Sequence, residues 1–203
     1  MGHYIGPKAR VNRRLGTEVY DSSGALRASH RRILPPGQHT QRRKRPTDYG
    51  RALMEKQKIC HYYGLSHRQL QRFYHMAKRA AGNTGQNLLT LCERRLDNIV
   101  WKAGFALTRA QARQAVSHGH MLVNGKRTDV PSYIVEPEDM IQVRKREDLQ
   151  KIYASRIEES SRPASAFLAV EPKEFLIKVV RLPANDDVGL PVNVNQVVEF
   201  LSR

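Results

Sequence analysis

The stretch TRAQARQAVSHGHMLVNGKR, residues 108–127, decides the fold. Thr108 followed three residues later by Gln111 has the form of a capping box, so we expect a helix to begin there. Gly119 stands where helices commonly end in the left-handed conformation. Asn124-Gly125, between two short strand-like runs, is the strongest hairpin signal that a short sequence carries. The stretch therefore predicts a helix followed by a β-hairpin.

The expected helix separates small apolar residues from cations. Ala112, Val116 and, by the same spacing, Ala115 are expected to face inward. Arg109 and Arg113, four residues apart, then share an outward face. Like charges at that spacing destabilise an isolated helix slightly, so the pair is better explained by an external anion. We interpret the surrounding region, Leu91 to Val143, as an RNA-binding module.

The charge of the chain is unevenly distributed. The 203 residues carry a net charge of +16, and hydrophobic residues make up 40% of them, enough for a folded core. Residues 1–90 contain 18 Lys and Arg against 4 Asp and Glu, residues 91–146 contain 10 against 6, and residues 147–203 contain 7 against 9. A merely solvated surface would be less lopsided. We expect polyanion binding, concentrated in the first half.

Several protein classes are excluded. No window of about 18 apolar residues exists, so a membrane span is not expected. The N-terminus lacks an apolar signal core, and Gly6 stands where a myristoylation site needs Ser or Thr. Cys60 and Cys92 suggest neither a disulfide framework nor a zinc knuckle, and each is expected on the inner face of a helix. By elimination, we expect a cytoplasmic protein.

The first half is expected to be a basic extension followed by helices. Residues 1–47 are punctuated by Gly and Pro, and their apolar residues have no period, so we expect irregular structure. Thr47 or Asp48 is expected to cap a helix over 49–63. Ser66 and Gln69 form a second capping box. A third helix is expected through 88–103, with three cations off its apolar stripe: Arg94, Arg95 and Lys102.

The second half is expected to mix strands and helices. Strands are expected at 131–135, 140–143, 167–170 and 175–180, and a helix at 148–158. Asn195 is expected to cap a last short helix. We divide the chain into a basic N-terminal extension (1–47), a helical domain (48–93, joined by 155–203) and a small RNA-binding module (94–154). The fold class is α+β: a mainly helical first domain, an inserted helix-helix-hairpin module, and a C-terminal segment that packs back.

Catalytic and metal signatures are absent. Gly119 to Lys126 resembles a phosphate loop, but five residues separate its glycines and Arg127 follows where Ser or Thr must hold magnesium. The spacings of Cys60, His61, His67 and His75 match no closed tetrahedral site. Neither a nucleophile-base arrangement nor a pair of carboxylates stands out. We therefore expect neither an enzyme nor a bound cofactor.

Short motifs run along the whole chain: 6–8, 13–14, 35–39, 48–50, 55–58, 63–64, 82–85, 95–98, 104–105, 123–125, 131–133, 181–183 and 198–200. Through these motifs the chain resembles, almost end to end, the family of the bacterial small-subunit ribosomal protein numbered four. The helix-hairpin module alone would not be specific, because it also occurs in pseudouridine synthases, a tyrosyl-tRNA synthetase and a heat-shock RNA-binding protein.

The resemblance implies a structural role in the small ribosomal subunit. The family binds a multi-helix junction in the 5′ region of small-subunit rRNA early in assembly, touches neighbouring protein five, and influences decoding accuracy. It also lines the path along which mRNA enters, where Arg42, Arg43 and Arg45 match the family's cations by position. Some relatives hold zinc through N-terminal cysteines. Here Ala9 and Asn12 occupy the first two such positions, so the resemblance implies a zinc-free form.

From charge and resemblance together we select the residues expected to contact rRNA: Lys8, Arg10, Arg13, Arg14, Arg51, Lys58, Arg68, Arg72, Lys78, Arg94, Arg109, Arg113, His118, Asn124, Lys126 and Arg127. The expected partners are small-subunit rRNA, protein five and mRNA, with no membrane and no homo-oligomer in the ribosome. Two alternatives remain: an RNA-modifying enzyme that uses the module as its substrate grip, and a free-standing RNA chaperone.

Overall fold

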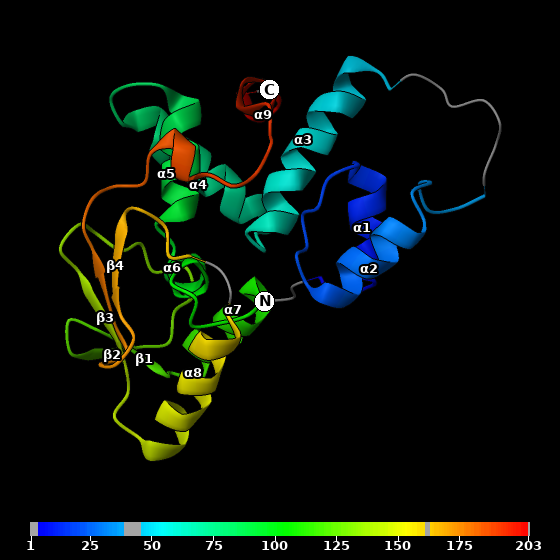
Figure 1. Cartoon of the computed structure of the whole chain (residues 1–203). Coiled ribbons are helices and arrows are strands. Elements are labelled where there is room, and N and C mark those ends of the chain that lie inside the picture. Colours follow the sequence, from blue (N-terminus) through cyan, green and yellow to red (C-terminus); the bar gives the residue numbers. More distant parts are fainter. Residues whose placement is uncertain (1–3, 39–45, 161–162, 203) are drawn as a thin grey trace. The chain divides into compact units, whose positions relative to one another are not determined.

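The chain forms two compact units in a computed structural model that describes residues 4–38, 46–160 and 163–202 (Figure 1). The first unit runs up to Leu88 and resumes at Gly189, and the second comprises Leu89–Val188. This division differs from the expected domains, which assigned residues 155–203 to the helical part. Residues 155–188 belong instead to the second unit, because the strands within them extend its sheet.

The basic N-terminal part of the first unit is helical, which corrects the expectation of irregular structure. Helix α1 covers Lys8–Leu15 and α2 covers Ser23–Arg31. Their few apolar side chains are nevertheless buried: Val11, Leu15, Val19 and Ala25. Asn12 supplements this small core, since its side-chain amide donates to the Tyr20 carbonyl and accepts from the Tyr20 amide, both at 2.9 Å. These two hydrogen bonds therefore order a segment whose structure the spacing of its apolar residues could not predict.

The first unit also contains α3 (Asp48–Tyr62), α4 (His67–Arg79) and α9 (Val194–Ser202). Thr47 caps α3, and Ser66 with Gln69 forms the full capping box of α4, as predicted. The cap of α9 is Asn193 and not Asn195, because the Asn193 side chain accepts from the Gln196 amide at 3.3 Å. Helix α9 packs against α3 (Figure 1).

The expected third helix is two helices, α5 (Thr84–Glu93) and α6 (Leu96–Lys102). Arg95 between them is extended, and it forms an isolated bridge with Ile134. The Leu96 amide donates to Tyr133 O and the Val135 amide to Arg94 O, each at 2.9 Å. The predicted strand at 131–135 contains only this bridge. Apolar spacing continues through the break because both helices bury residues there, so periodicity could not reveal it.

The second unit contains a five-stranded antiparallel sheet in the order β2-β1-β3-β5-β4. The strands are β1 (Met121–Val123), β2 (Lys126–Thr128), β3 (Met140–Val143), β4 (Leu168–Glu171) and β5 (Leu176–Val179). The predicted hairpin is confirmed, with Asn124 and Gly125 both at positive φ, 49° and 78°. Such angles suit a tight two-residue turn, which is why this pair is so diagnostic.

Helices α6, α7 (Arg109–Ser117) and α8 (Glu147–Glu159) share one apolar core with this sheet. Ala112, Ala115 and Val116 of α7 are buried in it, as predicted. Gly119 ends the α7 turn at φ 68°. Helices and antiparallel strands therefore share the chain, and the predicted α+β class is confirmed. No helix within the described residues has the length and apolar character needed to cross a membrane.

Candidate nucleic-acid interface

Helix α4 presents a cationic ridge on its exposed face. Arg68, Arg72, His75 and Arg79 follow one another at helical spacing and line a shallow groove with Gln71 and Met76. The opposite face is buried through Leu70, Phe73, Tyr74 and Ala77. The helix contains no acidic residue. Packing therefore fixes which side of α4 is basic, and that side is open to a polyanion. We call these four residues the α4 ridge.

Arg68, Arg72 and Lys78 on this helix were predicted as RNA contacts from sequence, but His75 and Arg79 were not. Lys78 is exposed, as are all four ridge residues. The missed signal was the spacing of the ridge residues, four, seven and eleven positions from Arg68, which places them on one stripe of an α-helix. The capping box at Ser66 already set the helix, so this stripe was available from sequence.

The four selected cations of α1 have unequal surroundings. Arg13 donates to the carbonyls of Leu34 and Pro35 at 2.7 and 3.4 Å, so it holds the segment after α2 in place. Lys8 lies 5.8 Å from the Tyr20 ring centre. Arg10 and Arg14 are exposed. Arg13 also lines a surface pocket with Arg31 and Arg32. These two cations were not among the RNA contacts predicted from sequence.

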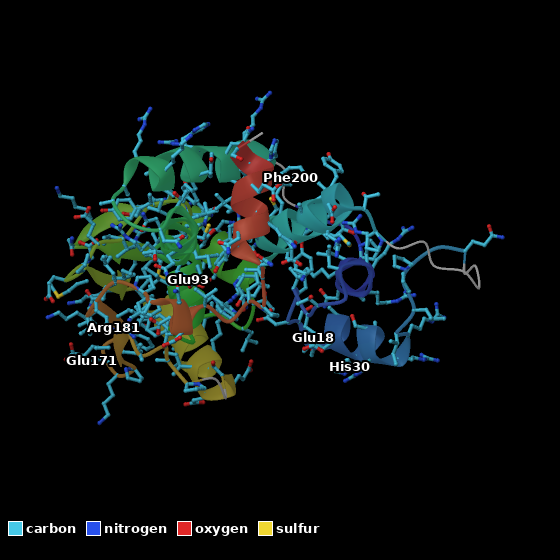
Figure 2. The ribbon with its side chains drawn as sticks, turned by 90° about the horizontal axis from the view of Figure 1, so that it is seen from above. Glu18, His30, Glu93, Glu171, Arg181 and Phe200 are labelled. Carbon is cyan, nitrogen blue, oxygen red and sulfur yellow. The ribbon has the colours of Figure 1, made fainter. Side chains whose placement is uncertain are left out.

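Ion pairs within the first unit occupy some cations. Lys58 binds Glu55 at 2.6 Å with both side chains only 15% exposed, and Glu55 also accepts the Asn193 amide at 2.8 Å. Lys58 therefore helps to join α3 to the start of α9, which makes it a poor RNA contact. Arg51 pairs with Asp48 on the exposed surface. His30 pairs with Glu18 at 2.5 Å in the N-terminal part (Figure 2).

Among the described residues, the histidine and cysteine near α1 and α3 form no metal site. The Tyr20 hydroxyl and His61 Nδ1 are 3.1 Å apart, and burial together with Arg14 lowers the pKa of His61. Burial raises the pKa of Cys60 to about 11, while Lys56 acts in the opposite direction. That thiol is therefore protonated at neutral pH and is a weak ligand. Within the described parts of the chain, no group of three potential ligands is close enough to hold a metal ion.

The N-terminus of α7 is capped as predicted, with one difference. Thr108 Oγ1 accepts from the Gln111 amide at 3.3 Å. The Gln111 side chain accepts at 2.8 Å from the amide of Leu107, one residue before Thr108. The hydrogen bond of the Gln111 side chain is therefore shifted by one residue from that of a capping box, and it fixes the loop that precedes the helix.

Arg109 and Arg113 do not form the open outward pair that was expected. Both are half-buried. Arg113 Nη1 lies 3.3 Å from Asp97 Oδ2, and Arg109 Nε donates to Asn98 Oδ1 at 3.2 Å. The Arg109 guanidinium also lies 3.4 Å from the Trp101 ring centre. Helix α6 of the same chain therefore supplies a carboxylate to Arg113 and an amide oxygen to Arg109.

Beneath α7 lies a buried ionic network that periodicity did not predict. Arg95 is fully buried, and its Nε and Nη2 bind the two oxygens of Asp97 at 3.0 and 2.5 Å. Lys102, 5% exposed, binds Glu93 at 2.9 Å, and Asn98 donates to the same carboxylate at 2.6 Å. Glu93 lies within the second unit (Figure 2). Arg95 and Lys102 were expected outside the apolar stripe. Instead they are buried, because each has a buried acidic partner.

The hairpin region combines structural and open groups. Asn124 donates to Asp139 Oδ1 at 2.7 Å and accepts from the Met140 amide at 2.9 Å, so its side chain holds the turn to β3. Arg94 donates to Val135 O at 2.9 Å. His118, Lys126 and Arg127 are exposed. Asn124 and Arg94 thus stabilise the module, whereas the other three are open to RNA. Arg42, Arg43 and Arg45 lie outside the described residues.

Comparison with known proteins gives a consistent result over the whole chain. Residues 3–93 match the ribosomal protein S4/S9 N-terminal domain, and residues 94–141 match the S4 domain. The chain is 51% identical to small ribosomal subunit protein uS4 of Rhodopirellula baltica, 45% to that of a Sulfurihydrogenibium species and 44% to that of Aquifex aeolicus. Each match covers the full length of both proteins. On these grounds the chain belongs to the uS4 family of small ribosomal subunit proteins.

Proposed function

We propose that this chain, a structural rRNA-binding protein of the small ribosomal subunit, nucleates subunit assembly by holding a helix junction in the 5′ region of the rRNA. Its place is on the ribosome, in the cytoplasm. The α4 ridge carries the proposal. It offers several exposed cations on one rigid helix that contains no acidic residue. Phosphates of an A-form helix can be met by such a row without any reading of bases.

Exposed cations elsewhere extend this surface. The proposed rRNA contacts are the open ones among those selected from sequence: Arg10, Arg14, Arg68, Arg72, Lys78, His118, Lys126 and Arg127, with His75 and Arg79 added. They occur in both units. A junction presents phosphates from several RNA helices at once, so cations spread over separate elements suit it better than a single stacking platform.

The alternatives from sequence are not retained. The relatives are proteins of the small ribosomal subunit and not enzymes, so the interpretation as an RNA-modifying enzyme is dropped. The same full-length matches favour a ribosomal constituent over a free-standing RNA chaperone. The finer roles rest on the family resemblance: contact with protein five, an influence on decoding accuracy, and Arg42, Arg43 and Arg45 on the mRNA path. We also propose a zinc-free protein that does not form a homo-oligomer in the ribosome.

Binding of the full chain to an rRNA fragment that contains the 5′ junction tests the proposal. We expect wild-type protein to bind this fragment more tightly than an unrelated duplex of equal length. The R68Q/R72Q variant should bind more weakly and show a flatter salt dependence, by roughly 0.7 in log–log slope for each lost phosphate contact. K151Q/K173Q is the matched control, because it removes two exposed cations of the second unit that we do not place in the interface. Equal affinity of wild-type protein for both RNAs would refute the proposal.

A further inference from the structure

His120 lies at the turn between α7 and β1, where three elements of the second unit hold it. Its amide donates to Ala115 O at 3.1 Å, and its carbonyl accepts from the Arg144 amide at 2.9 Å. Its ring Nδ1 is 3.2 Å from the hydroxyl of Tyr153, a buried residue of α8. The imidazole is therefore fixed in position and not a freely rotating surface group.

Cationic side chains gather around this imidazole. The His118 ring centre is 5.8 Å from that of His120. The Arg156 guanidinium lies 5.2 Å from the Tyr153 ring centre. The Arg127 guanidinium covers Gly119, where an added Cβ would collide with it at 2.3 Å. Arg146 follows Arg144 in a tight turn, in which its amide donates to Arg144 O at 2.8 Å.

No carboxylate forms an ion pair with these arginines within the described residues. Arg127, Arg144, Arg146 and Arg156 form no ion pair there. The nearest acids along the chain, Glu147, Asp148, Glu158 and Glu159, are exposed. Burial, and then His118, Arg156, Arg144 and Arg146, lower the pKa of His120. Each of these influences disfavours protonation of the His120 imidazole. We call these six residues, 118, 120, 127, 144, 146 and 156, the His120 cluster.

We propose that the His120 cluster is a second RNA-binding site, which takes phosphates of the rRNA backbone. This inference rests on the proposed rRNA-binding function and extends it beyond the matched S4 domain, because Arg144, Arg146 and Arg156 follow residue 141. Guanidinium groups suit phosphate oxygens because their donors form a planar fork. Four arginines from β2, the β3–α8 turn and α8 carry more charge than one free phosphate can neutralise. A backbone with successive phosphates fits them better.

Binding at this site is coupled to proton uptake. In the free protein the surrounding cations favour neutral His120. A phosphate at the cluster reverses that influence and raises the pKa of His120, because a nearby negative charge favours the protonated imidazole. The complex then binds more protons than the separated components near pH 6.5. Affinity for RNA therefore rises as the pH falls through this region and decreases as the pH rises.

Titration calorimetry of the full chain with the junction RNA tests the site. Measurements at one pH in buffers of different ionisation enthalpy give the number of protons taken up. We expect net uptake by wild-type protein near pH 6.5, and less uptake by H120N and by H118N. H118N removes one of the groups that lower the pKa of His120 in the free protein, so it should also reduce the uptake. His118 is exposed, so this variant keeps the test valid if H120N fails to fold.

Loss of charge at the cluster gives the second readout. R144Q/R146Q should flatten the salt dependence by roughly 0.7 for each lost contact. K151Q/K173Q, which removes the same charge outside the cluster, should change it less. If R144Q/R146Q matched this control and neither histidine variant altered proton uptake, while R68Q/R72Q still weakened binding, the second site would be wrong and the proposed function would stand. Absence of any specific binding by wild-type protein would overturn both.

Discussion

At the scale of single residues, sequence predicted which positions are small and buried better than it predicted what the cations do. Ala112, Ala115 and Val116 are in the core as expected, because helical spacing specifies the inward face. Arg95 was assigned to the surface from its charge, yet it is buried against Asp97. A cation can be buried when a carboxylate meets it, and that meeting depends on how the chain bends between α5 and α6. Spacing in the sequence does not contain this information.

The buried pair leads to a prediction about stability. In D97A, Arg95 loses the carboxylate that binds its Nε and Nη2, and Arg113 loses its ion pair. An unpaired buried charge typically costs about 3–5 kcal/mol, so the second unit should be strongly destabilised. Denaturant unfolding measures this. D129A, at an exposed position, is the control and should stay within about 0.5 kcal/mol of wild type. A loss in D97A no larger than in D129A would show that the network contributes nothing.

Two histidines predict how stability depends on pH. Burial first, then neighbouring cations, lowers the pKa of His61 and of His120 below the usual value of about 6.5. The unfolded chain therefore binds more protons than the folded chain when the pH falls below that value. Stability should be highest above about pH 6.5 and decrease as the pH falls through the lowered pKa values. Unfolding by urea between pH 7.5 and 5.5 measures the sign of this dependence. The stability of H120N should decrease less steeply than that of wild type as the pH falls. Stability that rises on acidification over this range would contradict the assignment.

At the scale of elements, local sequence signals predicted where helices begin but not where a helix is interrupted. Thr47, Ser66 and Thr108 cap the helices that they were expected to cap, because capping involves only neighbours in the chain. The break at Arg95 depends on backbone pairing with residues 133–135, about forty positions away. Helices α1 and α2 were not predicted for a related reason, since the hydrogen bonds that order this region join the Asn12 side chain to the Tyr20 backbone. Polar contacts between residues that are separated in the chain are not indicated by the spacing of apolar residues.

The capping box of α4 gives a prediction for an element that positions the α4 ridge. The Ser66 hydroxyl accepts from the Gln69 amide at 3.3 Å, and Gln69 Oε1 accepts from the Ser66 amide at 3.0 Å. S66A should destabilise the first unit by about 0.5–2 kcal/mol, whereas S66G should cost only a few tenths, roughly, because glycine suits the cap position. Thermal unfolding of the two variants against wild type measures the difference. Equal losses in both would mean that the cap contributes little to α4.

At the scale of the whole molecule, class and family were predictable from sequence, and the extent of the second unit was not. Charge distribution and the 108–127 stretch indicated an RNA-binding chain with a helix-hairpin module. Strands β4 and β5 were predicted individually, but the pairing of β5 with β3 and of β4 with β5 was not, and that pairing places residues 155–188 in the second unit. The His120 cluster shows the same limit, because Arg156 joins it only through α8, whose Tyr153 contacts His120 at the turn before β1.

The whole-molecule role also yields a prediction for Arg42, Arg43 and Arg45. If these cations contact mRNA, they act on a moving strand and contribute little to the rRNA assembly site. Replacing all three with Ala should leave binding to the isolated rRNA junction largely unchanged. It should slow translation through structured mRNA, because fewer cations hold the melted strand, and flatten the salt dependence of single-strand binding by roughly 0.7 per charge. The measurement compares ribosome progress through an mRNA hairpin for mutant and wild-type subunits that contain equal amounts of the protein. R27A, an exposed cation of α2 that we do not place in either interface, controls for the general loss of positive charge. Equal progress of mutant and wild-type ribosomes, together with a large loss of junction binding, would assign the three arginines to rRNA and contradict a role on the mRNA path.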